Sequence, residues 1–221
     1  MKINNVAVIG AGLMGSGIAA QVANAGFPVT LLDIVPDGAT NRNVIAESAV
    51  SKMLKPVKLG SPTPLMHRRN AKLITTGNIE DNLDFIKDAD LIIEVVLERL
   101  DVKHNVFRKI EEFRKKGSII TSNTSTIPRE QLVEGMPDSF AKDFMITHFF
   151  NPPRYLRLLE IVSGSEVSQE KVQIVSEFCD INLGKEVVVC NDTPGFIGNR
   201  IGTYWTLVGM VEAVKSGLTV E

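Results

Sequence analysis

Residues 1–33 constrain the fold of this chain more than any other stretch. "NNVAVIG" is a short run rich in Val and Ile that ends on glycine, as in a strand buried on both faces. "LMGSGIAAQVANAG" then places small and apolar residues at helical spacing and ends at Gly26, a helix terminator. "PVTLLD" indicates a second buried strand. A strand, a helix and a strand in this order predict a right-handed unit with parallel strands.

A glycine-rich G-x-G-x-x-G loop joins the first of these strands to the helix. Its first glycine allows a tight turn, its second lets the backbone approach a pyrophosphate, and its third lets helix and strand pack closely. The start of the helix offers free N–H groups and a positive dipole end to the phosphates. The loop therefore predicts a dinucleotide site. The expected contacts come from Gly10, Ala11, Gly12, Leu13, Met14 and Gly15.

Asp33 ends the second strand, roughly 20 residues after the glycine loop. A carboxylate at this position accepts hydrogen bonds from both ribose hydroxyls of the adenosine and repels a 2′-phosphate, so NAD is favoured over NADP. The alternative is a glycine-rich turn followed by a solvated aspartate.

Further strands and helices alternate along residues 1–190, which predicts an α/β domain with a doubly wound, Rossmann-like sheet. A polar, proline-rich excursion at about 36–72 interrupts it, and we expect a helical hairpin there, with helices around 40–55 and near 64–71. The strands are expected at 72–77, 89–96, 118–125, 143–150, 158–162 and 185–190, and the helices at 100–117, near 128–134 and near 168–182.

Residues 191–221 break this alternation. They begin with an Asp/Thr cap and a proline, continue as a long helix that is apolar around much of its circumference, and reach a stop at Gly217. A helix this apolar needs partners on more than one side. We therefore expect the first helix of a truncated all-α C-terminal domain, and association of the chain into a dimer or a larger species.

The composition excludes several function classes. With 24 basic and 26 acidic residues and no long block of like charge, nonspecific binding to nucleic acid or anionic membranes is not expected. The sequence has no signal-peptide pattern, no transmembrane run and no metal-ligand spacing, so we expect a cytoplasmic protein without a bound metal. Cys179 and Cys190 are interpreted as idle reduced thiols.

The stretch "THFFNPPRYLRLLEIV" carries the candidate proton-transfer pair, His148 and Glu160. Histidine suits removal of a hydroxyl proton near neutral pH, and a carboxylate on its other nitrogen fixes the tautomer. Glu160 lies among aliphatic residues, where a carboxylate needs a partner, and the turn at 151–153 can return the chain to supply one. The alternative is a structural pair. His67 and His104 are interpreted as surface residues.

Several motifs in order, "IGAGLMGSGIA", "LLD", "VLERLDVK", "SNTS", "HFFNPPRYLRLLE" and "DTPGFIGNRI", resemble the L-3-hydroxyacyl-CoA dehydrogenase family over essentially the whole chain. The likeness is strongest to the long bacterial form fused to an enoyl-CoA hydratase region. It implies a homodimeric enzyme of fatty-acid β-oxidation that interconverts L-3-hydroxyacyl-CoA and 3-ketoacyl-CoA with NAD.

The resemblance also implies residue roles. His148 would be the base and Glu160 its orienting partner, while Ser125 and Asn199 would bind the substrate's 3-oxygen, Ser125 beside the nicotinamide and Asn199 also positioning His148. Glu98 and Lys103 would lie near the nicotinamide ribose, with Asn123 and Asn151 lining the nicotinamide pocket. The alternatives are ordinary loop residues at 123 and 125, an exposed ion pair at 98 and 103, and a helix-surface amide at 199.

Two departures from the family pattern leave rival functions open. The excursion is more proline-rich than the family's lysine-rich hairpin over CoA, so Lys52, Lys55 and Lys58 are either phosphate ligands or a solvated face. Most of the C-terminal domain is missing, so we expect NAD binding with poor turnover. The rivals are a dehydrogenase of a free 3-hydroxy acid such as L-gulonate, and a non-catalytic dinucleotide-binding protein resembling lambda-crystallin.

Overall fold

The computed structural model describes residues 2–56 and 63–219. In these ranges eight strands form one sheet in the order β3-β2-β1-β4-β5-β6-β7-β8. Strands β1 to β6 are parallel, β7 runs antiparallel to β6, and β8 is parallel to β7. The strands are β1 (Val6–Ile9), β2 (Val29–Asp33), β3 (Ile74–Asn78), β4 (Leu91–Glu94), β5 (Ile119–Ser122), β6 (Phe144–Phe149), β7 (Leu158–Ser163) and β8 (Glu186–Val189). The predicted doubly wound α/β class is confirmed.

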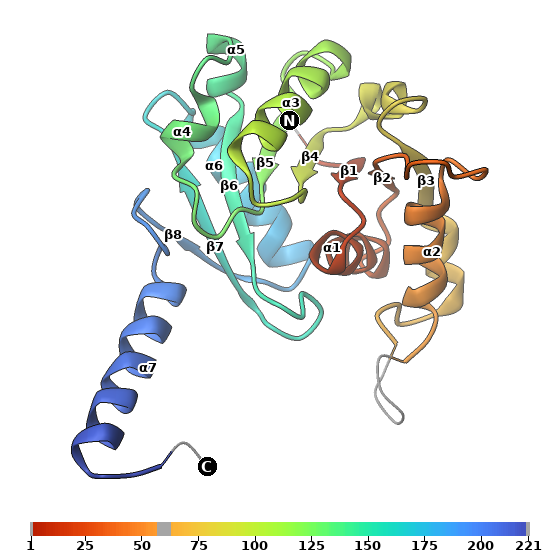
Figure 1. The fold of residues 1–221 in the computed structure, drawn as a ribbon. Helices are drawn as coiled ribbons and strands as arrows, with labels where there is room; N and C mark the ends of the chain where they lie inside the picture. Colours follow the sequence, from red (N-terminus) through yellow and green to blue (C-terminus); the bar gives the residue numbers. More distant parts are fainter. Residues whose placement is uncertain (1, 57–62, 220–221) are drawn as a thin grey trace.

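Helices cover both faces of the sheet and enclose two hydrophobic cores (Figure 1). One core lies under α1 (Leu13–Asn24), α2 (Val44–Met53) and α6 (Gln169–Glu177). The other lies under α3 (Leu100–Phe113), α4 (Arg129–Val133), α5 (Asp138–Ala141) and the 3-10 helix η2 (Leu83–Asp88). The predicted helix near 168–182 is α6 continued by the π-turn η3 (Phe178–Asn182). The short helices η2 and α5 were not predicted.

The excursion contains α2 as predicted, but its second helix is a 3-10 helix, η1 (Arg68–Leu73). Only a short segment precedes β3 here, and the Asn24 side chain ties it to α1: Asn24 Oδ1 accepts from the Met66 backbone N–H at 2.8 Å and from Asn70 Nδ2 at 3.0 Å. These contacts hold the start of η1 and the residues before it against α1. Of the candidate phosphate ligands, Lys52 and Lys55 are exposed, and Lys58 lies outside the described residues.

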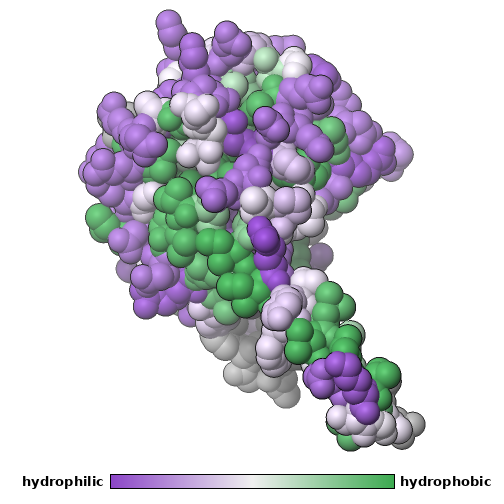
Figure 2. Space-filling view, turned by 90° about the vertical axis from the view of Figure 1, so that its left-hand side faces the viewer, coloured by the Kyte–Doolittle hydropathy of each residue, from purple (hydrophilic) through white to green (hydrophobic). Residues whose placement is uncertain are grey.

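The last helix, α7 (Gly198–Lys215), projects from the body of the domain (Figure 1). It has no buried residue, and Figure 2 shows hydrophobic side chains exposed along the projecting arm. Among the described residues, no helix combines the length and apolar character that a membrane crossing requires.

The predicted cap of α7 was wrong. Asp192 instead accepts from the backbone N–H groups of Arg129 and Glu130 at 3.0 and 3.2 Å, so it caps α4. Gly195 and Phe196 have positive φ values of 75° and 46°, and this left-handed turn delays the start of α7. The boundary between the two predicted domains, near residue 190, stays a prediction.

Candidate active site

The carboxyl ends of the parallel strands lie at one edge of the sheet. The strand order reverses at β1, because β2 lies on one side of β1 and β4 lies on the other. Ligands of open α/β sheets bind at such a switch point. The glycine loop follows β1, Asp33 ends β2, and His148 lies near the end of β6. The predicted site residues thus come from several strands that share this edge.

The glycine loop has the geometry of a phosphate cradle. Gly10 has a φ of 109°, and an added Cβ there would lie 2.5 Å from the Val95 carbonyl oxygen. At Gly15 an added Cβ would lie 1.8 Å from the Gly10 oxygen, whereas at Gly12 it would meet nothing within 4 Å. Helix α1 begins directly after Gly12, and no side chain caps it. The open approach and uncapped N–H groups fit a dinucleotide pyrophosphate.

Asp33 lies directly beside this loop. Its Oδ2 accepts from the Ala11 backbone N–H at 2.5 Å, and its Oδ1 accepts from that of Ile34 at 2.7 Å. These bonds hold the carboxylate at the end of β2. Its predicted contact with the ribose stays a prediction.

A cavity of about 310 Å³ opens between the glycine loop and the segments that follow β4 and β5. It contains seven of the predicted cofactor residues. The lining consists of Gly12, Leu13, Met14, Val95, Val96, Leu97, Glu98, Lys103, Asn123 and Ser125. The structure therefore brings the glycine loop and the "ERLDVK" and "SNTS" motifs to one space.

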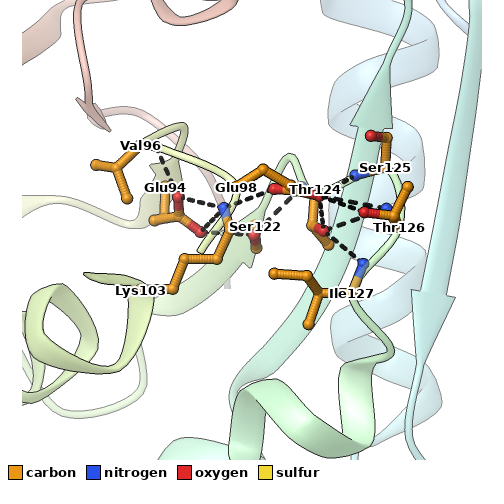
Figure 3. Close-up of polar contacts among 9 residues, drawn as sticks. All are labelled: Glu94, Val96, Glu98, Lys103, Ser122, Thr124, Ser125, Thr126 and Ile127. Carbon is orange, nitrogen blue, oxygen red and sulfur yellow. Dashed lines mark hydrogen bonds and ion pairs between the residues drawn. The ribbon is translucent and has the colours of Figure 1, made fainter. Parts of the chain in front are cut away.

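Lys103 is buried in an ion-pair cluster with two glutamates (Figure 3). Its side chain is 1% exposed, and its Nζ lies 2.8 and 3.0 Å from the two carboxylate oxygens of Glu94 and 3.2 Å from Glu98 Oε2. Of the alternative, an exposed pair at 98 and 103, the structure bears out only the exposure of Glu98; Lys103 is buried, because α3 turns its first turns toward β4.

Glu98 organises the loop after β5. Its Oε1 accepts from the backbone N–H groups of Ser125 and Thr126 at 2.9 and 3.3 Å and from the hydroxyl groups of Thr124 and Thr126 (Figure 3). Burial raises the pKa of the Glu98 carboxyl, but the Thr124 hydroxyl, the Lys103 ammonium and the Ser125 N–H outweigh burial and hold the pKa below its usual value. The lowered pKa favours the charged form of this carboxylate.

Glu94 is the site residue that our sequence reasoning missed. Its fully buried carboxylate accepts from the Val96 N–H at 2.7 Å and from Ser122 Oγ at 2.5 Å, in addition to Lys103. Burial raises the pKa of the Glu94 carboxyl above its usual value, although the three donors lower it. A carboxylate within the aliphatic run "ADLIIEVV" is the same signal that drew attention to Glu160, so the sequence did mark it.

His148 and Glu160 meet as predicted. They are directly opposed in the β6–β7 hairpin, and His148 Nδ1 lies 2.7 Å from Glu160 Oε2. Glu160 is fully buried and His148 is 6% exposed. The rings of Phe150 and Phe196 flank the imidazole, with centroids 4.6 and 5.6 Å away. The pair therefore lies in a largely dry environment.

Glu160 is also bonded to the start of α7. Its Oε1 accepts from the Ile197 and Gly198 backbone N–H groups at 2.9 and 2.7 Å. No local pattern announces this contact, because it depends on how the last helix docks against β7. Both carboxylate oxygens are thus occupied.

The remaining predicted residues lie around this pair at different depths. Asn123 Oδ1 accepts from the Phe149 N–H at 2.9 Å and ties the β5 loop to β6, whereas Asn151 is exposed in the hairpin turn. Asn199 is half-buried and lines a second cavity of about 760 Å³ with Thr126 and the first turns of α7. In the described part of the chain no hydrogen bond joins Asn199 to His148.

The other two histidines make no contact with this pair among the described residues, and the two cysteines are buried thiols. His67 is exposed, and His104 is half-buried with its Nε2 2.9 Å from the Gln131 carbonyl oxygen. Both cysteines are buried, and burial raises the thiol pKa of Cys179 to about 12 and of Cys190 to about 11. Within residues 2–56 and 63–219, no group of three or more His, Cys, Asp or Glu side chains could hold a metal ion.

Comparison with known proteins gives consistent matches. Residues 5–193 match the family model described as "3-hydroxyacyl-CoA dehydrogenase, NAD binding domain". The chain is 47% identical over 219 residues to a probable 3-hydroxyacyl-CoA dehydrogenase of Deinococcus radiodurans, covering 99% of this chain and 62% of that protein. It is 46% identical to a putative fatty acid oxidation complex trifunctional enzyme of Rickettsia felis, covering 92% of this chain and 28% of that protein.

A solved structure agrees with these matches. The fold superposes on FadB2 of M. tuberculosis with a TM-score of 0.82 at 29% identity, covering 100% of this chain and 75% of that one. The likeness to a trifunctional relative is consistent with the expected resemblance to a long fused form. The chain spans less than two thirds of the length of these two curated relatives.

Proposed function

Because this chain belongs to the 3-hydroxyacyl-CoA dehydrogenase family and carries its NAD-binding domain, we propose that the protein interconverts L-3-hydroxyacyl-CoA and 3-ketoacyl-CoA in fatty-acid β-oxidation. The observation that carries this proposal is the buried His148–Glu160 pair at the sheet edge where the glycine loop opens. A dry, oriented imidazole beside a dinucleotide cradle suits removal of a hydroxyl proton.

The hydrogen bond between His148 and Glu160 decides which ring nitrogen acts. An ionised carboxylate only accepts hydrogen bonds, so His148 Nδ1 carries the hydrogen and Nε2 presents a lone pair. Nε2 takes the proton of the substrate hydroxyl, and Glu160 stabilises the imidazolium that forms. NAD, when bound, supplies the acceptor for the hydride from C3.

Glu160 keeps this role because its other oxygen is already occupied. The two N–H groups at the start of α7 donate to Oε1 and hold it in place. The carboxylate thus cannot rotate away from the imidazole without losing these bonds.

The other predicted roles are proposed on position. Ser125 and Asn199 would bind the substrate oxygen, since both lie beside the cavities at this edge. The glycine loop, Asp33, Glu98, Lys103, Asn123 and Asn151 would hold NAD. A homodimer and a cytoplasmic location also belong to this proposal.

Turnover by the full-length protein tests the proposal. We expect NADH formation with 3-hydroxybutyryl-CoA, and His148→Gln should lower kcat by about 10²–10⁴-fold while NAD still binds. His67→Gln is the matched control, because His67 is an exposed histidine away from the sheet edge. Wild-type rates in His148→Gln would remove His148 as the base.

The same assay separates the rival functions. Faster reduction of NAD with free 3-hydroxy acids such as L-gulonate than with the CoA ester would identify a dehydrogenase of free acids. NAD binding without turnover of either substrate by the full-length protein would favour the non-catalytic alternative.

A further inference from the structure

Glu94 is a buried ionisable group for which the proposed reaction has no use. We propose that Glu94 sets the charge of the nicotinamide side of the site: by neutralising Lys103 it leaves the negative charge of Glu98 uncompensated, and so favours oxidised over reduced cofactor. Glu94 is thus a positioning residue that acts through Lys103. This inference rests on the proposed binding of NAD.

The charge balance follows from the contacts. Lys103 Nζ lies 2.8 and 3.0 Å from the two oxygens of Glu94, but 3.2 Å from only one oxygen of Glu98. Glu94 receives hydrogen bonds from Lys103, Ser122 and the Val96 N–H, and each of these groups is a donor, which suits an ionised carboxylate. Two carboxylates and one ammonium leave one negative charge.

That charge lies on the residue that faces the cavity. The Glu98 side chain is 38% exposed, whereas Glu94 and Lys103 are 0% and 1% exposed. Glu98 lines the 310 Å³ cavity with Ser125 and Asn123, whereas Glu94 does not. The Lys103 ammonium lies between the two glutamates (Figure 3). Lys103 also lines this cavity, but its side chain is covered, so the exposed charge of the cluster is the Glu98 carboxylate.

The positions of Glu98 and Ser125 in the sheet place them near the expected nicotinamide end of the cofactor. The adenosine half of a dinucleotide lies over the β1–β2 side, where Asp33 is located, and the other half crosses the switch point toward β4 and β5. Glu98 and Ser125 follow β4 and β5. Since the oxidised nicotinamide ring carries a positive charge and the reduced ring does not, a nearby negative charge stabilises the oxidised form.

Binding of the two cofactor forms tests this charge balance without turnover. The dissociation constants of NAD⁺ and NADH are measured by titration calorimetry for the wild type and for Glu94→Gln, which keeps the shape and loses the charge. We expect the preference for NAD⁺ over NADH to fall by about fivefold, as for unit charges roughly 10 Å apart in a partly solvated site. Glu112→Gln, an exposed site on the same helix, should leave the preference unchanged.

A double variant separates charge from structural damage. Glu94→Gln with Lys103→Met again leaves Glu98 as the single charge, so the preference should return to the wild-type value. Glu98→Gln should lower the preference as Glu94→Gln does. If Glu94→Gln does not fold, as judged by circular dichroism, the cofactor preferences of Glu98→Gln and of the double variant still test the charge balance.

Two results would overturn the inference: an unchanged preference in Glu98→Gln or in folded Glu94→Gln, or a double variant that does not return to the wild-type preference. Neither outcome bears on the reaction proposed for His148. Failure of the wild type to bind either cofactor form would instead refute the proposed NAD-dependent function, and is distinguished from both by the same titration.

Discussion

Three glutamates at the sheet edge show how neighbours assign different roles to one residue type. Glu160 is divided between an imidazole and the start of a helix, Glu94 holds a buried ammonium, and Glu98 binds a loop while facing the cavity. In each case the partners satisfy the carboxylate before any ligand arrives. At the scale of single residues, the site is preorganised by hydrogen bonds within the chain.

Gly198 is a residue whose lack of a side chain matters for this arrangement. Its N–H donates to Glu160, and an added Cβ would lie 2.7 Å from Cζ of Phe150, the ring that flanks His148. We expect Gly198→Ala to lower the free energy of unfolding by about 1–3 kcal/mol through overpacking, and to slow NAD reduction by the full-length protein. Urea unfolding and initial rates measure the two effects.

Gly202 provides the matched control one turn further along α7. An added Cβ there meets nothing within 4 Å, so Gly202→Ala should keep the wild-type rate and gain up to about 1 kcal/mol of stability from its higher helix propensity. Equal behaviour of the two variants would contradict a special role for Gly198.

At the scale of elements, a buried lysine donates hydrogen bonds to the turn of the β6–β7 hairpin. Lys185, just before β8, donates to the carbonyl oxygens of Pro153 and Leu156, and its ammonium lies 5.6 Å from the Phe149 ring. Burial lowers the pKa of Lys185 to about 8. The turn that pairs His148 with Glu160 thus depends on an amine that is costly to keep charged.

This lowered pKa predicts a pH dependence of stability. The unfolded chain binds the Lys185 proton up to its ordinary pKa of 10.5, and the folded chain only up to about 8. Stability should therefore rise between about pH 8 and 10.5 relative to Lys185→Met, by at most about 3 kcal/mol. Urea unfolding of both proteins at pH 7.5 and 10 measures this difference, and parallel pH dependences would contradict it.

At the scale of the whole molecule, α7 stands out because none of its residues is buried in the part of the chain that the structure describes. Its exposed apolar residues include Ile201, Tyr204, Trp205, Leu207, Val208, Met210 and Val211. Burying this surface against another chain would be favourable in water. We therefore expect residues 1–221 to associate with rising concentration.

The single tryptophan reports on this association. Trp205 is 77% exposed on α7, so its fluorescence emission should shift to shorter wavelength as the chain associates. Light scattering over the same concentrations gives the mass. A monodisperse monomer at micromolar concentration with unshifted emission would count against association.

The sequence by itself determined the features that depend on local pattern. Strand and helix periods specified the α/β class, glycine spacing specified the phosphate loop, and the proline turn between His148 and Glu160 predicted that they meet. It also contained the signal for Glu94, a carboxylate in an aliphatic strand, although Glu94 was not predicted as a site residue.

Only the tertiary structure decided the contacts between segments far apart in the chain. The reversal of β7, the capping of α4 by Asp192, the bond between Glu160 and α7, and the burial of Lys103 between two glutamates each depend on how finished elements dock. Local propensity cannot specify such contacts, because a side chain's partners are set by which surfaces the packed cores bring together.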